Sequence, residues 1–261
     1  MSSLPRTLVA YASLILLYLP SLAVGVYSVN KARFGLAWRG FTLSWYKSLL
    51  ENERILEAAW NSLLLACVST VIATVLGTAL ALGLERSPWP KSCQRLFDTL
   101  INIPVVVPDI IMAVSLVLAM GVLRAISPIF ELSLGALILG HVTFQISFVT
   151  LVVRSRLVSL SPETREAAQD LFASRLYHFW RVTLPLITPG VLAGAMLAFT
   201  LSLDDFIISF FLHGPESVTM PIYIFSSLKR GLTPETNALS TLTLLATVFL
   251  ALLAERLTRR L

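Results

Sequence analysis

Charged residues are scarce in this sequence: Asp, Glu, Lys and Arg make up 13% of its 261 residues, whereas an ordinary soluble domain carries about 25%. Hydrophobic residues reach 56%, and the mean hydropathy is +0.80. So little charge in so long a chain excludes an ordinary soluble fold and indicates a membrane protein. The net charge of +5 comes from short basic segments between apolar runs. This pattern indicates membrane topology and not a surface for nucleic acid.

The residues that hold metals and nucleotides are also few. Cys67 lies in an apolar run and Cys93 in a polar connector, and the chain has only three histidines, far apart. These residues predict no disulfide framework and no metal site. The chain contains no Gly-Lys pair, so it lacks the loop that cradles ATP phosphates, and it has no nucleophile elbow or HExxH sequence. We therefore expect no enzyme activity and no cofactor in this chain, and any ATP hydrolysis must belong to a partner.

Six apolar runs are long enough to cross about 30 Å of hydrocarbon at about 1.5 Å per residue. Backbone polar groups in lipid must bond within the segment, so helices are expected. The sequence predicts an all-α polytopic membrane protein with about six transmembrane helices, the first retained as an anchor. The runs are Val9–Val29, Trp60–Leu84, Leu100–Leu123, Leu134–Val153, Ile187–Leu212 and Asn237–Ala254.

Basic residues predict the orientation of these spans, because they favour the cytoplasmic side. With the N-terminus inside, twelve of the 20 Lys and Arg residues fall in the cytoplasmic segments. Five of the other eight lie in the first outer loop. We expect both termini to be cytoplasmic.

Two spans carry small residues at every fourth position, a spacing that lets helix backbones approach closely in lipid. We interpret both stripes as packing faces, with a substrate-lining role as the alternative. The first stripe is Ala66, Thr70, Thr74 and Thr78, and the second is Gly190, Gly194, Ala198 and Ser202.

The polar segment between the fourth and fifth runs predicts two short amphipathic helices. Ser161, Pro162 and Glu163 are typical of a helix start. A second helix is expected over residues 176–183, ending before Pro185. The segment either lies on the membrane surface or docks a soluble partner.

The residues of this segment resemble the EAA loop of permeases in binding-protein-dependent ATP-binding-cassette (ABC) importers. The pattern is EAA, three residues, Gly, nine residues, Ile-x-Leu-Pro. Here Phe172 replaces the Gly and Val182 the Ile, while every spacing is kept. The matching residues are Glu166, Ala167, Ala168, Leu171, Ala173, Val182, Leu184 and Pro185.

The resemblance implies an ABC importer type I permease fold, with residues 1–261 as a single transmembrane domain and 161–185 as its cytoplasmic coupling loop. Glu166, Ala167, Ala168, Leu171 and Phe172 would dock a dimer of separate ATPase subunits.

Over nearly the whole chain the sequence is similar to spermidine/putrescine permeases of the PotC type. The segments that carry this similarity are residues 33–46, 108–110, 141–144, 199–205, 214–215 and 234–239. Gln145 and Ser147 depart from the Cys and Pro expected after His-x-Thr-Phe. The similarity implies a bacterial inner membrane subunit that works with a sister permease of the PotB type and a periplasmic substrate-binding protein to carry polyamines by alternating access.

Three carboxylates fall within apolar runs, where an ionisable group is costly unless it faces a cavity or a partner. Counting along the third run places Asp109 near the membrane midplane, after Pro104 and Pro108, on a helix that these prolines break. Asp204 and Asp205 lie toward the outer end of the fifth run. Together with Phe206 and Tyr223 they are candidates for a polycation path. The structural alternative is that Asp204 pairs with an Arg or caps a helix.

His141 lies in the fourth run beside Thr143. A proton relay is conceivable there, but we interpret His141 as an interhelical hydrogen-bonding residue. Two other functions stay open at this point: the same importer class with iron(III) or thiosulfate as cargo, and a secondary transporter that needs no ATPase. The halves of the chain show no internal symmetry of the kind that secondary transporters carry.

Overall fold

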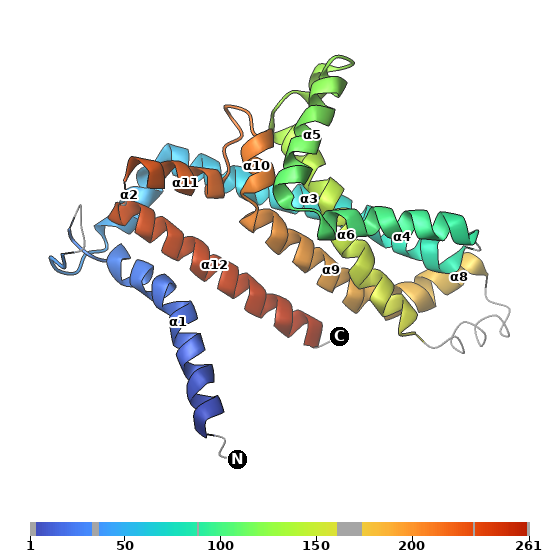
Figure 1. Cartoon of the computed structure of the whole chain (residues 1–261), viewed down its shortest axis with the longest axis horizontal. Coiled ribbons are helices and arrows are strands. Elements are labelled where there is room, and N and C mark those ends of the chain that lie inside the picture. The colour runs from blue at the N-terminus through green and yellow to red at the C-terminus, as the bar shows by residue number, and fades with distance from the viewer. Residues whose placement is uncertain (1–3, 33–36, 88, 161–173, 232, 260–261) are drawn as a thin grey trace. The chain divides into compact units, whose positions relative to one another are not determined.

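The structure is a computed structural model that describes residues 4–32, 37–87, 89–160, 174–231 and 233–259 (Figure 1). The predicted all-α class is confirmed: the described residues form helices, and their one β-type pairing is an isolated bridge between Asn30 and Phe41. The chain divides into two compact units, residues 1–58 with 220–250 and residues 59–219 with 251–261. Each is described by itself.

The helices follow one another along the chain with short connections. They are α1 (Leu4–Ser28), α2 (Ser44–Glu51), α3 (Glu53–Arg86), α4 (Lys91–Val106), α5 (Asp109–Arg124), the 3₁₀ turn η1 (Pro128–Phe130), α6 (Leu134–Val158), α8 (Arg175–His178), the π-helical turn η2 (Phe179–Thr183), α9 (Leu184–Asp204), α10 (Ile207–Leu212), α11 (Met220–Arg230) and α12 (Pro234–Arg259).

Four described helical segments are long and apolar enough to cross a membrane: 7–28, 53–85, 134–158 and 176–204. The pair α4 and α5 makes a fifth if the two are taken as one broken span. The sixth expected run lies in α12, outside this set. Its 26 residues rise about 39 Å at about 1.5 Å each, more than the hydrocarbon thickness.

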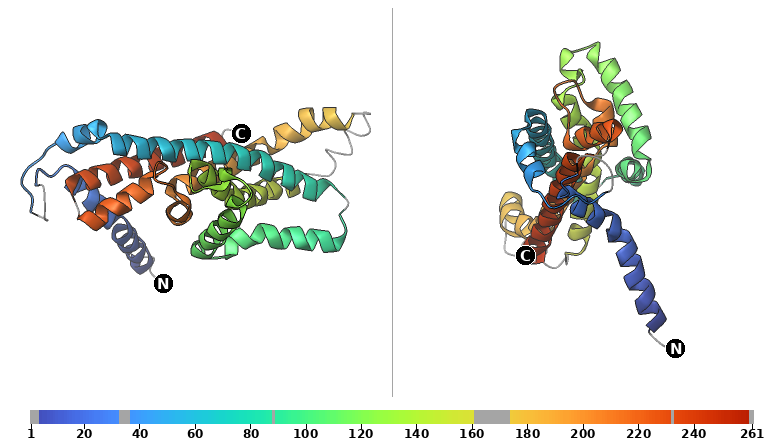
Figure 2. Two further views of the ribbon diagram at one scale, coloured as in Figure 1. Left: turned by 90° about the horizontal axis from the view of Figure 1, so that it is seen from above. Right: turned by 90° about the vertical axis from the view of Figure 1, so that its left-hand side faces the viewer.

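The third predicted run is not one helix. It divides into α4 and α5, whose axes differ by 112° (Figures 1 and 2). Pro108 explains the break, because a residue that precedes proline avoids the helical region. Val107 is accordingly extended, with φ −74° and ψ 132°. The proline break predicted for this run is confirmed, and the depth of Asp109 in the membrane stays a prediction.

The expected helix end before Pro185 is also wrong. Helix continues from Arg175 through η2 into α9 and ends at Asp204. Pro185 lies in the first turn of α9, where its missing N–H is tolerated. The preceding turn widens into a π-helix, and the Leu184 N–H reaches back five residues to the Phe179 carbonyl.

α6 and α9 pack side by side (Figure 1), and the predicted small-residue stripe of α9 forms the seam. A Cβ on Gly190 would lie 2.7 Å from Arg156 Cβ, and one on Gly194 would lie 3.4 Å from Val149 Cα. Gln145 of α6 donates to the Ala198 carbonyl at 2.9 Å. The packing interpretation of this stripe is confirmed.

The predicted stripe on α3 is buried in its first half, at Ala66 and Thr70, whereas in the second half the packed face lies one residue before the predicted one. The closest approach is at Gly77, where a Cβ would lie 2.8 Å from Val149 Cβ, and Ala73 and Ala81 on the same face are fully buried. The hydroxyls of Thr70, Thr74 and Thr78 are buried with no hydrogen-bond partner among the described residues. α6 therefore approaches α3 most closely at positions with very small side chains, such as Gly77. These positions lie next to the threonines in the sequence.

The first unit has a small core of its own around Leu49, Ile55, Ala238 and Leu239. Asn52 and Ser48 donate to the Glu235 carboxylate at 3.4 and 3.5 Å, and these bonds connect α2 and its C-terminal flank to the start of α12.

Candidate functional site

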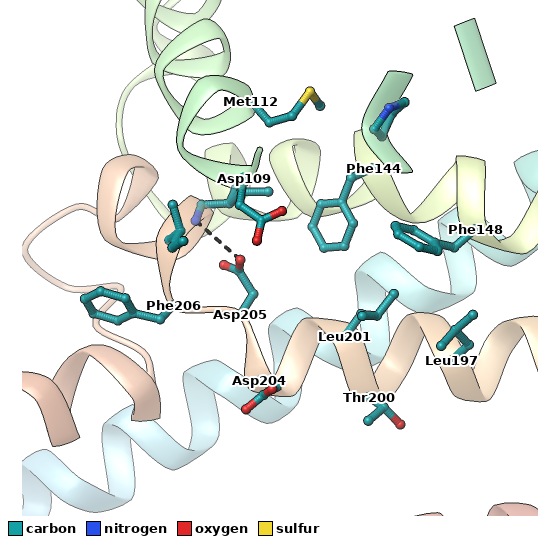
Figure 3. A pocket seen from close by; sticks show the side chains of 13 residues that line it. Asp109, Met112, Phe144, Phe148, Leu197, Thr200, Leu201, Asp204, Asp205 and Phe206 are labelled. Atoms are coloured by element: carbon teal, nitrogen blue, oxygen red, sulfur yellow. Dashed lines mark hydrogen bonds between the residues drawn. The ribbon is translucent and has the colours of Figure 1, made fainter. Parts of the chain in front are cut away.

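A cavity of about 480 Å³ opens in the second unit, beside the breaks that follow α4 and α9 (Figure 3). Three of the residues that line it carry carboxylates, and most of the other lining residues are aromatic or aliphatic. The lining residues are Pro104, Asp109, Met112, Phe144, Phe148, Leu197, Thr200, Leu201, Asp204, Asp205, Phe206, Ile207 and Ile208. Four of the five candidate path residues thus meet in one pocket.

Asp109 enters the pocket from the first turn of α5, directly after the proline break. Its side chain is exposed, and no described residue gives it a hydrogen bond or an ion pair. Figure 3 shows its carboxylate turned toward the same space as that of Asp205. Two carboxylates that face one space repel each other, and no basic side chain lines that space, which favours a cationic occupant.

Asp204 and Asp205 are neighbours in the sequence with different surroundings. Asp204 ends α9, is exposed, and has no hydrogen-bond or ion-pair partner among the described side chains. Asp205 accepts the Ile208 N–H at 3.3 Å and the Ser209 N–H at 2.8 Å. The helix cap that was the structural alternative for Asp204 is therefore made by Asp205.

His141 is fully buried beneath this break and is hydrogen-bonded to both sides of it. Its Nδ1 lies 2.8 Å from the Ser202 hydroxyl of α9, and its Nε2 lies 3.1 Å from the Ser209 hydroxyl of α10. Nε2 is also 3.4 Å from Asp205 Oδ2. The predicted interhelical hydrogen bond is confirmed, while its partners and its contact with Asp205 could not be read from the sequence.

The remaining candidates divide between this pocket and other parts of the chain. Phe206 lines the pocket and its ring lies 5.4 Å from that of Phe210. Tyr223 belongs to the first unit, where it lines a separate cavity of about 150 Å³ with Glu235. The coupling-loop candidates Glu166, Ala167, Ala168, Leu171 and Phe172 lie outside the described residues.

Sequence reasoning missed the aromatic wall made by Phe144 and Phe148. The two rings lie one helical turn apart on α6 and meet edge to face, with centroids 6.4 Å apart. Their spacing of four residues was a signal, but an apolar span gives the same spacing to many pairs that face lipid.

The lining chemistry suits an elongated organic cation. No Lys, Arg or His is among the lining residues, and of the three carboxylates only Asp205 has a histidine, His141, behind it. The aromatic faces can stack on methylene groups or hold an ammonium by cation–π attraction. No three Asp, Glu, His or Cys side chains of the described residues converge as a metal site.

Residues 73–261 match the family described as binding-protein-dependent transport system inner membrane component. Among curated proteins, the chain is similar to the spermidine/putrescine transport system permease protein PotC of Haemophilus influenzae, with 37% identity over 94% of this chain and 92% of the relative. It is also similar to the putrescine transport system permease protein PotI of Escherichia coli K12, with 39% identity over 87% and 81% of the two chains.

Among solved structures, the fold resembles a chain of a bacterial ABC transporter that imports the acidic polysaccharide alginate. The TM-score is 0.78, with 19% identity over 99% of this chain and 95% of that one. The long family match and the identity to curated permeases agree with the apolar helices described above. This chain belongs to the family of inner membrane components of binding-protein-dependent transport systems, and it is a multi-pass, non-enzymatic membrane subunit.

Proposed function

We propose that this chain translocates polyamines such as spermidine or putrescine across the inner membrane, as one permease of an ATP-driven importer that works by alternating access. The pocket in the second unit carries the proposal, because it combines three carboxylates with aromatic walls and has no basic lining residue. The names of the similar permeases from H. influenzae and E. coli support the same cargo.

A polyamine places ammonium groups at intervals along a flexible methylene chain. Asp109 and Asp204, which have no described partner, can each pair with an ammonium, and Asp205 adds a third negative group. The Phe144, Phe148 and Phe206 rings would contact the methylene segments and the ammonium faces. An anion such as thiosulfate would meet only repulsion in this pocket.

The other subunits follow from the family. We propose that two ATPase subunits bind ATP and dock on the segment from Glu166 to Phe172, and that a sister permease of the PotB type completes the pathway. A periplasmic binding protein would deliver the cargo. With both termini cytoplasmic, the coupling segment and the ATPase subunits would lie on the same side of the membrane.

The cargo is tested by ATP-driven uptake of labelled spermidine and putrescine in vesicles that hold this chain with its genomic partners. Wild type is compared with Asp109→Asn and Asp204→Asn, which keep size and remove charge. Saturable uptake that either change weakens supports the proposal. A complex whose ATPase responds to its binding protein but which carries only iron(III) or thiosulfate would overturn the polyamine assignment and leave the importer assignment intact.

The docking role of Glu166 has its own test. Glu166→Lys should leave the amount of chain in the membrane unchanged and uncouple ATP hydrolysis from uptake, since it reverses the charge of a side chain that we propose contacts the ATPase. Uptake at the wild-type rate in this variant would contradict the assignment.

A further inference from the structure

The break between α9 and α10 contains no residue that breaks helices. Its sequence is Leu203-Asp204-Asp205-Phe206, with neither proline nor glycine, and α9 is otherwise a continuous 21-residue helix. Asp205 is nevertheless extended, with φ −66° and ψ 121°. Neither proline nor glycine forces this break, so side-chain contacts must hold it, beginning with the Asp205 carboxylate and the N–H groups of α10 that it accepts.

His141 adds contacts from α6. It is bonded to Ser202 before the break and to Ser209 after it, and its Nε2 lies 3.4 Å from the Asp205 carboxylate between them. The backbone N–H groups of Ile208 and Ser209 bind the same carboxylate. One imidazole thus contacts all three segments of the break.

The hydrogen bonds of the cluster can be satisfied together. With the proton on Nε2, His141 donates toward Asp205 and Ser209, and its Nδ1 accepts from the Ser202 hydroxyl. Asp205 then has donors on its protein side, while 10% of its side chain remains exposed and it lines the pocket. The carboxylate is held in one orientation, unlike those of Asp109 and Asp204.

We propose that His141 is a positioning residue for cargo binding: it holds the α9–α10 break open and fixes the Asp205 carboxylate at the pocket wall. The proposal rests on the proposed function for its consequence in transport, since His141 itself does not line the pocket. Its structural part can be tested without any cargo.

The first test is hydrogen exchange of the purified complex, followed by mass spectrometry over residues 205–212. His141→Leu should increase exchange at the Ile208 and Ser209 amides several-fold, because the Asp205 carboxylate loses its contact with the imidazole and is no longer held against these amides. His141→Gln, whose amide can reach the position of Nε2, should keep protection near the wild-type level. His141→Asn, which reaches only as far as Nδ1, should behave like Leu.

Gln145→Leu is the matched control. Gln145 is buried one turn away on the same face of α6 and bonds to α9 but not to the break. If Gln145→Leu increases exchange over residues 205–212 as much as His141→Leu does, the effect is a general loosening of the seam. The positioning role is then overturned, as it is if His141→Leu leaves this exchange unchanged.

The second test is a double-mutant cycle on spermidine uptake per complex. His141→Leu should lower the rate about tenfold, the size expected when a hydrogen bond to a charged group is lost, and His141→Gln should restore most of it. In an Asp205→Asn background His141→Leu should add little, because it acts through Asp205, whereas Gln145→Leu should combine additively.

The two tests separate the two proposals. Altered exchange in a complex that carries no polyamine would overturn the cargo assignment and leave the positioning role standing. If the complex carries polyamines and the effects of His141→Leu and Asp205→Asn on the uptake rate are fully additive, the cargo assignment is supported and the role of His141 in transport is overturned.

Discussion

The pocket lies beside two helix breaks that arise in different ways. Between α4 and α5 the break is local, because Pro108 forces the preceding residue out of the helix. Asp109, next to it, has no described partner. Between α9 and α10 the chain has no such residue, and the break depends on Asp205 and His141. A break made by proline leaves its carboxylate free for a ligand, whereas a break made by side chains uses its carboxylate as part of the structure.

Removal of the Asp205 carboxylate should have the largest effect on stability. Asp205→Ala removes a helix cap and leaves buried donors unpaired, which together should cost about 2–4 kcal/mol. Asp204→Ala, one residue away and exposed, should change stability by less than about 0.5 kcal/mol. Thermal denaturation of the purified complexes ranks the two, and equal melting temperatures would contradict the distinction between these neighbours.

Separation of α3 from α6 should come next. A Cβ on Gly77 would lie 2.8 Å from Val149 Cβ and 3.0 Å from the Ile146 carbonyl oxygen, so Gly77→Val should cost about 1–3 kcal/mol through overpacking. Gly121 of α5 has open space around it, which makes Gly121→Val the control. The expected result is a lower melting temperature for the first variant only. A similar loss in both would point to the valines themselves as the cause.

The proline break should be more tolerant. Ala can adopt the backbone angles of Pro108, so Pro108→Ala should cost only about 0.4–1 kcal/mol, through the greater freedom of the unfolded chain. Pro104 lies inside α4, where proline removes a helical hydrogen bond, and Pro104→Ala should stabilise the protein. Opposite shifts in melting temperature are expected. If both variants shift the melting temperature in the same direction, contacts of other residues, and not Pro108, hold the bend.

Asp109→Asn should have the smallest effect on stability, within about 0.5 kcal/mol, because the exposed carboxylate has no described partner. Its effect on spermidine uptake should be clear, since an ammonium would lose its counter-charge. Denaturation and uptake measured on the same preparation test both parts. A strongly destabilised variant would show that Asp109 is structural, as Asp205 is.

The sequence predicted the features that depend on local chemistry. Apolar runs located the spans, Pro108 marked the first break, and the stripe from Gly190 to Ser202 identified the face of α9 that packs against α6. It also indicated that His141 bonds across helices. Each of these is set by side-chain size, backbone restriction or polarity within a few residues.

Features that depend on distant partners could not be predicted. The second break needs a histidine more than 60 residues away from it in the sequence. The second half of the packed face of α3 was predicted one residue off, because the close approach at Gly77 depends on Val149 of another helix. Tyr223 was grouped with the pocket by residue type, although it lines a cavity of the other unit. Residue type suggests a chemistry, but only tertiary contacts decide which side chains share a site.

The π-helical turn at Phe179–Thr183 also sets an angle. A π turn holds one residue more than an α turn, and each residue of an α-helix advances about 100° around the axis. Deletion of one residue from this turn would convert it to α-helix and rotate α8 by about 100° relative to α9. This single turn therefore sets which face of α8 is aligned with a given face of α9, and a change of one residue in its length would turn α8 without altering any of its side chains.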